Sequence, residues 1–161
     1  MGKALFITGT GTDIGKTYVT GLIVKKLVDA GLRAGYYKAA LSGAETLADG
    51  TLLPGDALHV AQIAGLAAED ASVSYIYRDA VSPHLAAQIE NRPMDFDKVE
   101  QDFKQAQERT DYLTVGGAAA LSAPCVGTMR SMLSWTISSC ASDSPRSSLR
   151  MQDSARSTPP S

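Results

Sequence analysis

The sequence predicts an α/β fold, in which a parallel sheet is flanked by helices. Short apolar segments that are typical of strands alternate with segments whose apolar residues recur at helical spacing. A Gly- and Thr-rich turn joins the first strand to the first helix, which favours a nucleotide-binding member of this class. The pattern is clear only for residues 1–115, so we expect a small, truncated sheet.

The first predicted helix lies between the first two predicted strands in the sequence. Residues 4–7 form an apolar run that predicts a strand. Apolar residues recur at helical spacing through 16–30, and Gly31 is suited to the C-terminal cap of that helix. A second short strand is predicted at 33–37, ending at Lys38.

The remaining elements continue the alternation. A helix is predicted at 56–64, a third strand at 73–77 and a short helix at 84–91. A longer helix follows, with Asp95 or Asp97 as its N-cap, and a fourth strand comes after it at 112–115. Ligands of parallel sheets bind at the carboxyl ends of the strands, where we expect the first turn and the residues after Lys38 to meet.

The turn at residues 9–17 has the layout of a phosphate-binding loop. Its backbone N–H groups and the following helix N-terminus would face an anion, Lys16 would neutralise phosphates, and the Thr17 hydroxyl would hold Mg²⁺. The strict spacing of the motif is not met, because Thr10 stands where the first Gly belongs and Gly9 lies one residue earlier. An ordinary Gly-rich turn is the alternative. With the phosphate-binding interpretation, the expected fold is a P-loop NTPase-like sheet.

Residues 116–161 differ in composition from the rest of the chain. They hold 12 Ser and 2 acidic residues, against 4 Ser and 15 acidic residues in 1–115. A disordered Ser-rich tail and a linker to an absent domain are two interpretations. We favour a third, out-of-frame translation, because suitable codons for 116–126, read in another frame, encode Glu-Gly-Ser-Gly-Gly-Ile-Val-Cys-Pro-Leu-Arg. On this interpretation residues 1–115 are a partial nucleotide-binding domain and 116–161 are a disordered tail.

Composition excludes several classes of function. The formal net charge is -2, and no basic cluster indicates nucleic-acid or membrane binding. Both cysteines, Cys125 and Cys140, lie in the segment of uncertain frame, so neither a zinc site nor a disulfide framework is supported. No signal peptide or transmembrane run is predicted, and we expect a cytoplasmic protein.

Several short motifs match one family in combination, although each alone is weak. They are found at residues 8–17, 35–38, 42–43, 55–58, 82–87 and 111–115. Together they resemble the ATP-dependent dethiobiotin synthetases of biotin biosynthesis, over residues 2–115. The resemblance implies that 7,8-diaminononanoate and CO₂ are joined with ATP and Mg²⁺ to close the dethiobiotin ring. It also implies a homodimer for the intact family.

The resemblance implies a role for each residue that matches the motifs. ATP would be bound by Asp13, Ile14, Gly15, Lys16, Thr17, Tyr18 and Asp56. Lys16 and Lys38 would be catalytic, at the nucleotide phosphates and at the carbamate with the γ-phosphate. Thr12 and Ser42 would bind carbamate oxygens of the substrate. Thr17 and Asp56 would hold Mg²⁺, which prefers one or two carboxylates together with phosphate and water.

Structural roles are the alternatives for these residues. Lys38 could be a surface lysine, Ser42 a loop serine and Asp56 a plain helix N-cap. His84 follows a proline and could simply cap a helix, so we leave it outside the catalytic set. Gly116 stands where the family has a metal-binding Glu, and for this reason we expect the chain as printed to be inactive.

Two other classes of protein remain. A partition-type P-loop ATPase would carry a Lys five residues before the loop lysine, where this chain has Gly11, and would lack the pattern from Lys38 to Ser42. A truncated, non-enzymatic nucleotide-binding fragment is the second alternative.

The out-of-frame interpretation predicts a specific result at the gene level. Sequencing genomic DNA across the codon for Gly116 should reveal one further base, which creates a Glu codon and opens the frame for Gly-Ser-Gly-Gly. A confirmed frame that encodes residues 116–161 as printed would show that the interpretation is wrong.

Overall fold

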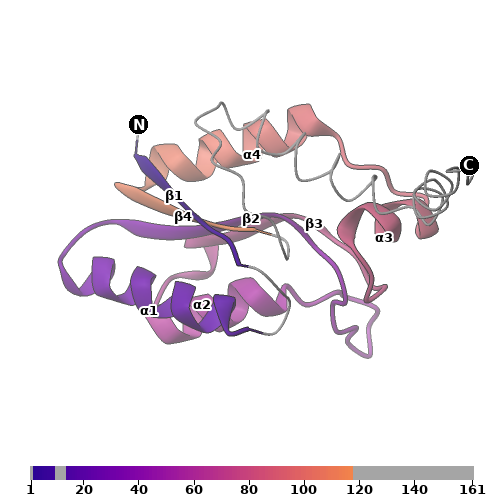
Figure 1. The fold of residues 1–161 in the computed structure, drawn as a ribbon, viewed down its shortest axis with the longest axis horizontal. Helices are drawn as coiled ribbons and strands as arrows, with labels where there is room; N and C mark the ends of the chain where they lie inside the picture. The colour runs from indigo at the N-terminus through magenta and orange to yellow at the C-terminus, as the bar shows by residue number, and fades with distance from the viewer. Residues whose placement is uncertain (1, 10–13, 118–161) are drawn as a thin grey trace, which may run out of the picture.

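The computed structural model describes residues 2–9 and 14–117 as an α/β unit (Figure 1). The predictions for residues 10–13 and 118–161, including the disordered tail, lie outside the described residues. The strands are β1 (Lys3–Ile7), β2 (Ala34–Leu41), β3 (Ala71–Ile76) and β4 (Tyr112–Gly116). The helices are α1 (Lys16–Asp29), α2 (Gly55–Ala64), the short 3-10 helix η1 (Ala68–Asp70), α3 (Pro83–Ile89) and α4 (Phe96–Arg109).

The four strands form one parallel sheet with the order β1-β4-β2-β3. Helices α1 and α2 lie on one side of this sheet and α4 on the other (Figure 1). The predicted α/β class is therefore confirmed. Parallel strands joined through helices bring all four carboxyl ends to one edge of the sheet, which is where a site can form.

Strand β2 is longer than its sequence pattern predicted. It runs on to Leu41, so Lys38 lies inside the strand, where it pairs with Val73, rather than at the strand end. The extension follows from pairing, because β3 continues beside β2 as far as the pair of Leu41 and Ile76. Ser42 is the first residue beyond the strand.

Strand β4 also passes the predicted boundary at Val115. Gly116 pairs with Ile7 of β1, and the Gly117 N–H donates to the Ile7 carbonyl at 2.9 Å. The ladder with β1 therefore continues for a further residue, although glycine is a weak strand former by itself. At the start of α4, Asp95 is the N-cap, and its carboxylate accepts a hydrogen bond from the Asp97 N–H.

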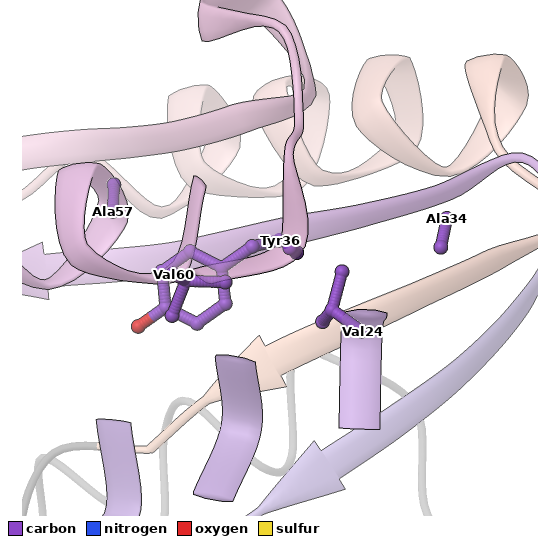
Figure 2. Packing of buried hydrophobic residues seen from close by; sticks show 6 residues of the cluster. Val24, Ala34, Tyr36, Ala57 and Val60 are labelled. Atoms are coloured by element: carbon purple, nitrogen blue, oxygen red, sulfur yellow. The ribbon is translucent and has the colours of Figure 1, made fainter. Parts of the chain in front are cut away.

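Two apolar clusters cover the two faces of the sheet. The cluster beside α1 and α2, shown in Figure 2, consists of Val24, Ala34, Tyr36, Ala57, Val60 and Ala64. The cluster beside α4 consists of Tyr37, Val99, Phe103, Ala106, Leu113 and Val115. Successive residues of a strand face opposite sides, so Tyr36 and Tyr37 enter different clusters, and Lys38 shares the face of Tyr36.

Two further observations describe the surface of the unit. Strand β1 forms one edge of the described sheet, and its Leu5 and Phe6 are each 40% exposed. Among the described residues, no helix has the length and hydropathy needed to cross a membrane.

The buried centre of β4 should dominate stability. Leu113 is only 1% exposed and packs under α4, so Leu113→Ala should lower the free energy of unfolding by about 2–5 kcal/mol. Leu22→Ala is the matched control, because Leu22 is 45% exposed on α1 and should cost less than about 0.5 kcal/mol. Urea titration followed by circular dichroism measures both. Equal losses for the two variants would contradict the observed packing.

Candidate functional site

A cleft of about 840 Å³ lies at the carboxyl ends of the strands. Five of the predicted site residues line it: Lys16, Thr17, Lys38, Ser42 and Asp56. They come from α1, from β2 and the turn after it, and from the first turn of α2. Residues separated by up to 40 positions in sequence are thus brought together by the parallel arrangement of the strands.

The loop before α1 delivers Lys16 and Thr17 to the cleft. Gly15 adopts a left-handed conformation with φ of 83°, which residues with a side chain rarely adopt. This turn allows α1 to begin directly at Lys16, and the Thr20 hydroxyl donates to the Lys16 carbonyl at 2.7 Å. The helix N-terminus therefore opens onto the cleft, as the phosphate-binding interpretation requires.

Asp56 connects the three elements of the site. The Thr17 hydroxyl donates to its Oδ1 at 3.0 Å, and Lys38 forms an ion pair with its Oδ2. The side chains of Lys38 and Asp56 are 13% and 26% exposed. The alternative role of Asp56 as the N-cap of α2 is wrong, because Pro54 holds that position and Asp56 lies inside the first turn.

The charge of Asp56 is stabilised by its neighbours. Burial raises the pKa of Asp56, but the hydrogen bonds from Lys38 and Thr17 and the positive charges of Lys38 and Lys16 outweigh it and hold the pKa below its ordinary value. Asp56 is therefore ionised at neutral pH. An ionised carboxylate beside a threonine hydroxyl is a suitable partial ligand set for Mg²⁺, with phosphate and water as further ligands.

Among the described residues that line the cleft, Glu45 is the one acidic residue besides Asp56. The described ranges contain no group of three or more His, Cys, Asp or Glu that could hold a metal ion. Gly116 lines the cleft but offers no side chain to a cation. Thr17 and Asp56 fit Mg²⁺ only when a phosphorylated ligand completes its coordination.

Two of the predicted residues, Thr12 and Asp13, are outside the described residues. Ile14 and Tyr18 are each 55% exposed and do not line the cleft. His84 is hydrogen-bonded to Gln88 on α3 and is likewise absent from the cleft wall.

Sequence reasoning missed four polar residues of the cleft wall, namely Thr20, Tyr36, Glu45 and Ser82. Tyr36 had a usable signal, since it lies two positions before Lys38 in a strand and therefore faces the same side. Glu45 and Ser82 belong to loops, whose course a strand pattern does not reveal.

The depressed pKa of Asp56 predicts a dependence of stability on pH. A carboxyl whose pKa is lowered on folding stabilises the protein above its unfolded value, near pH 4, and this contribution disappears as the pH falls through the folded value. Wild type should thus lose more stability than Asp56→Asn between about pH 4 and pH 2. Denaturant titration at several pH values provides the measurement, with Asp29→Asn, at an exposed pair with Lys25, as the control. Parallel curves for wild type and Asp56→Asn would contradict the assigned contacts.

Comparisons with known proteins identify a family and several similar proteins. A family model described as "AAA domain" matches residues 3–134. An ATP-dependent dethiobiotin synthetase BioD of Clostridium botulinum (strain 657 / Type Ba4) is 50% identical over 125 residues, which cover 77% of this chain and 55% of that protein. The protein of the same name from Brachyspira hyodysenteriae (strain ATCC 49526 / WA1) is 49% identical over 125 residues, covering 77% and 54%.

Two facts describe how far these matches extend. The chain spans about half the length of the curated relatives it matches. The family model also continues beyond Val115 to residue 134, into the segment for which an out-of-frame origin is predicted. The resemblance seen in the motifs is confirmed by relatives at about half identity over most of the chain. The chain therefore belongs to the AAA-domain family, and it is similar in sequence to relatives named ATP-dependent dethiobiotin synthetases.

Proposed function

We propose that this chain carries the phosphate-binding and carbamate-binding half of a dethiobiotin synthetase site. The reaction joins 7,8-diaminononanoate and CO₂ at the expense of ATP. The single observation that supports this best is the contact of Asp56 with both Thr17 and Lys38 in a cleft that Lys16 also lines. Two cations, a hydroxyl and a carboxylate are what a phosphoryl transfer needs.

The first bond forms between one substrate amine and the carbon of CO₂. The amine loses a proton, and a carbamate results. Its negative oxygens would lie against the Lys38 ammonium, while the Ser42 hydroxyl, at the end of β2, would donate a hydrogen bond to them. Thr12 would be a further donor.

The carbamate oxygen then attacks the γ-phosphorus of ATP, and the bond to the β-phosphate breaks. Lys16 and the N-terminus of α1 would stabilise charge on the phosphates. Mg²⁺ bound by Thr17 and Asp56 would neutralise phosphate charge. The second amine attacks the activated carbonyl carbon, inorganic phosphate leaves, and the cyclic urea of dethiobiotin is complete.

Gly116 suggests that the printed chain does not complete this cycle. It provides no second carboxylate at the cleft, and the chain spans about half of its relatives' length. A nucleotide-binding fragment without turnover is thus the second candidate function. For the intact protein we propose a homodimer in the cytoplasm.

The lysine assignments are testable in a protein whose frame is restored after Val115. Lys16→Ala and Lys38→Ala should each lower dethiobiotin formation by about 100- to 1000-fold, because each removes a positioned charge contact. Lys25→Ala is the control, since Lys25 pairs with Asp29 on the exposed face of α1 and should leave turnover unchanged. Near-normal turnover by Lys38→Ala would exclude its proposed role. The printed chain should show no turnover in the same assay.

A further inference from the structure

Tyr36 is a buried residue of the cleft that no step of the proposed reaction uses. It lies on β2, two positions before Lys38, and both residues line the cleft. The residue is 2% exposed. Figure 2 shows its ring beside Val60, with the hydroxyl oxygen directed away from Val24 and Ala34.

The hydroxyl of Tyr36 has no hydrogen-bond partner among the described residues. The neighbouring tyrosines differ in this respect. The Tyr37 hydroxyl contacts Ser74 Oγ at 2.8 Å and donates to the Val99 carbonyl at 3.0 Å, while Tyr77 donates to the Arg92 carbonyl at 2.9 Å. Because Tyr36 lines the cleft, its hydroxyl is available to a ligand there, whereas the hydroxyls of Tyr37 and Tyr77 are engaged within the protein.

Gly116 makes room for this hydroxyl at the end of β4. A Cβ atom at residue 116 would lie 2.3 Å from the Tyr36 hydroxyl oxygen and 2.9 Å from its Cζ. Any larger residue would therefore displace the phenol. The glycine leaves the hydroxyl at the cleft, where both residues line the wall with Asp56 and Thr17.

The surroundings determine which kind of ligand this hydroxyl suits. Burial and, to a smaller extent, the charge of Asp56 raise the pKa of Tyr36, so the phenol stays protonated and can donate at neutral pH. Lys16 and the N-terminus of α1 bring positive charge to the same cleft, while Lys38 is paired with Asp56. Hydrogen bonds to ionised acceptors are about twice as strong as those between neutral groups.

We propose that the Tyr36 hydroxyl donates a hydrogen bond to an anionic oxygen of the ligand in this cleft. Tyr36 is thus a further binding residue of the site in the chain that carries Gly116, and this assignment rests on the proposed function. The oxygen belongs either to a phosphate of the nucleotide or to the carbamate of the diamine.

The test uses Tyr36→Phe in the full chain, which removes the hydroxyl and keeps the ring. Two probes separate the two sources of the anion. Inorganic tripolyphosphate with Mg²⁺ reports on the phosphate site without an adenine ring, and 7,8-diaminononanoate with bicarbonate reports on the carbamate site. Calorimetry should show affinity for one probe or both reduced by about tenfold or more, as for bonds to charged groups.

Tyr37→Phe is the matched control. It removes a hydroxyl that bonds within the protein on the other face of the sheet, so it should lower the melting temperature and leave both affinities unchanged. Tyr36→Phe should lower the affinity for at least one probe and leave the melting temperature unchanged. A second variant, Gly116→Ala, should lower the affinity for the same probe as Tyr36→Phe does, because the added methyl group crowds the phenol. The effect of Gly116→Ala should be smaller in the double variant with Tyr36→Phe.

The outcomes distinguish this inference from the proposed function. The role of Tyr36 is wrong if the affinity of Tyr36→Phe for each probe that wild type binds stays within twofold of the wild-type affinity. The proposed function would still stand in that case. Wild-type binding of tripolyphosphate but not of the diamine would overturn the proposed substrate, while a loss of tripolyphosphate affinity in Tyr36→Phe would still support the hydroxyl contact. A wild-type chain that binds neither probe would overturn both.

Discussion

The contacts of Asp56 are the interaction on which the site depends. Through Thr17 they connect α2 to the phosphate-binding end of α1, and through Lys38 they connect it to β2. A carboxylate at this depth is tolerated because a cation and a hydroxyl both approach it. Without Asp56 the Lys38 ammonium would lose its partner, and no shared contact would hold Thr17 and Lys38 in position relative to each other.

The sheet makes this meeting possible. Parallel strands need helices between them, and each crossover returns the chain to the same end of the sheet. As a result, α1 follows β1 and α2 follows β2 with their N-termini at the cleft. The alternation of side chains along β2 then sends Tyr36 and Lys38 to the face of α1 and α2, while Tyr37 packs under α4. Residues that line the cleft thus alternate with a residue that packs under α4 along one strand.

Gly116, at the end of β4, has more than one effect on the structure. Gly116 extends the ladder with β1 and leaves space that the Tyr36 phenol occupies. The same glycine brings no side chain to the cleft that it lines. One residue therefore influences both the strand and the position of a buried phenol.

Local patterns in the sequence determined the alternation of strands and helices and the Gly-rich turn before α1, whereas Lys38 and Asp56 were predicted as site residues from the family resemblance. Apolar periodicity depends on neighbours within a few positions, so it can be recognised without a structure. Lys16 and Thr17 were accessible for the same reason, because their motif is continuous in sequence.

Only the tertiary structure decided how far β2 extends, because strand length is set by pairing with β3 rather than by the composition of β2. It also decided that Asp56 contacts Thr17 and Lys38 instead of capping α2, since these contacts join residues 39 and 18 positions apart. The position of the Tyr36 phenol beside Gly116 depends on two strands and a helix at once. Such long-range contacts follow from how the chain packs, which no local pattern records.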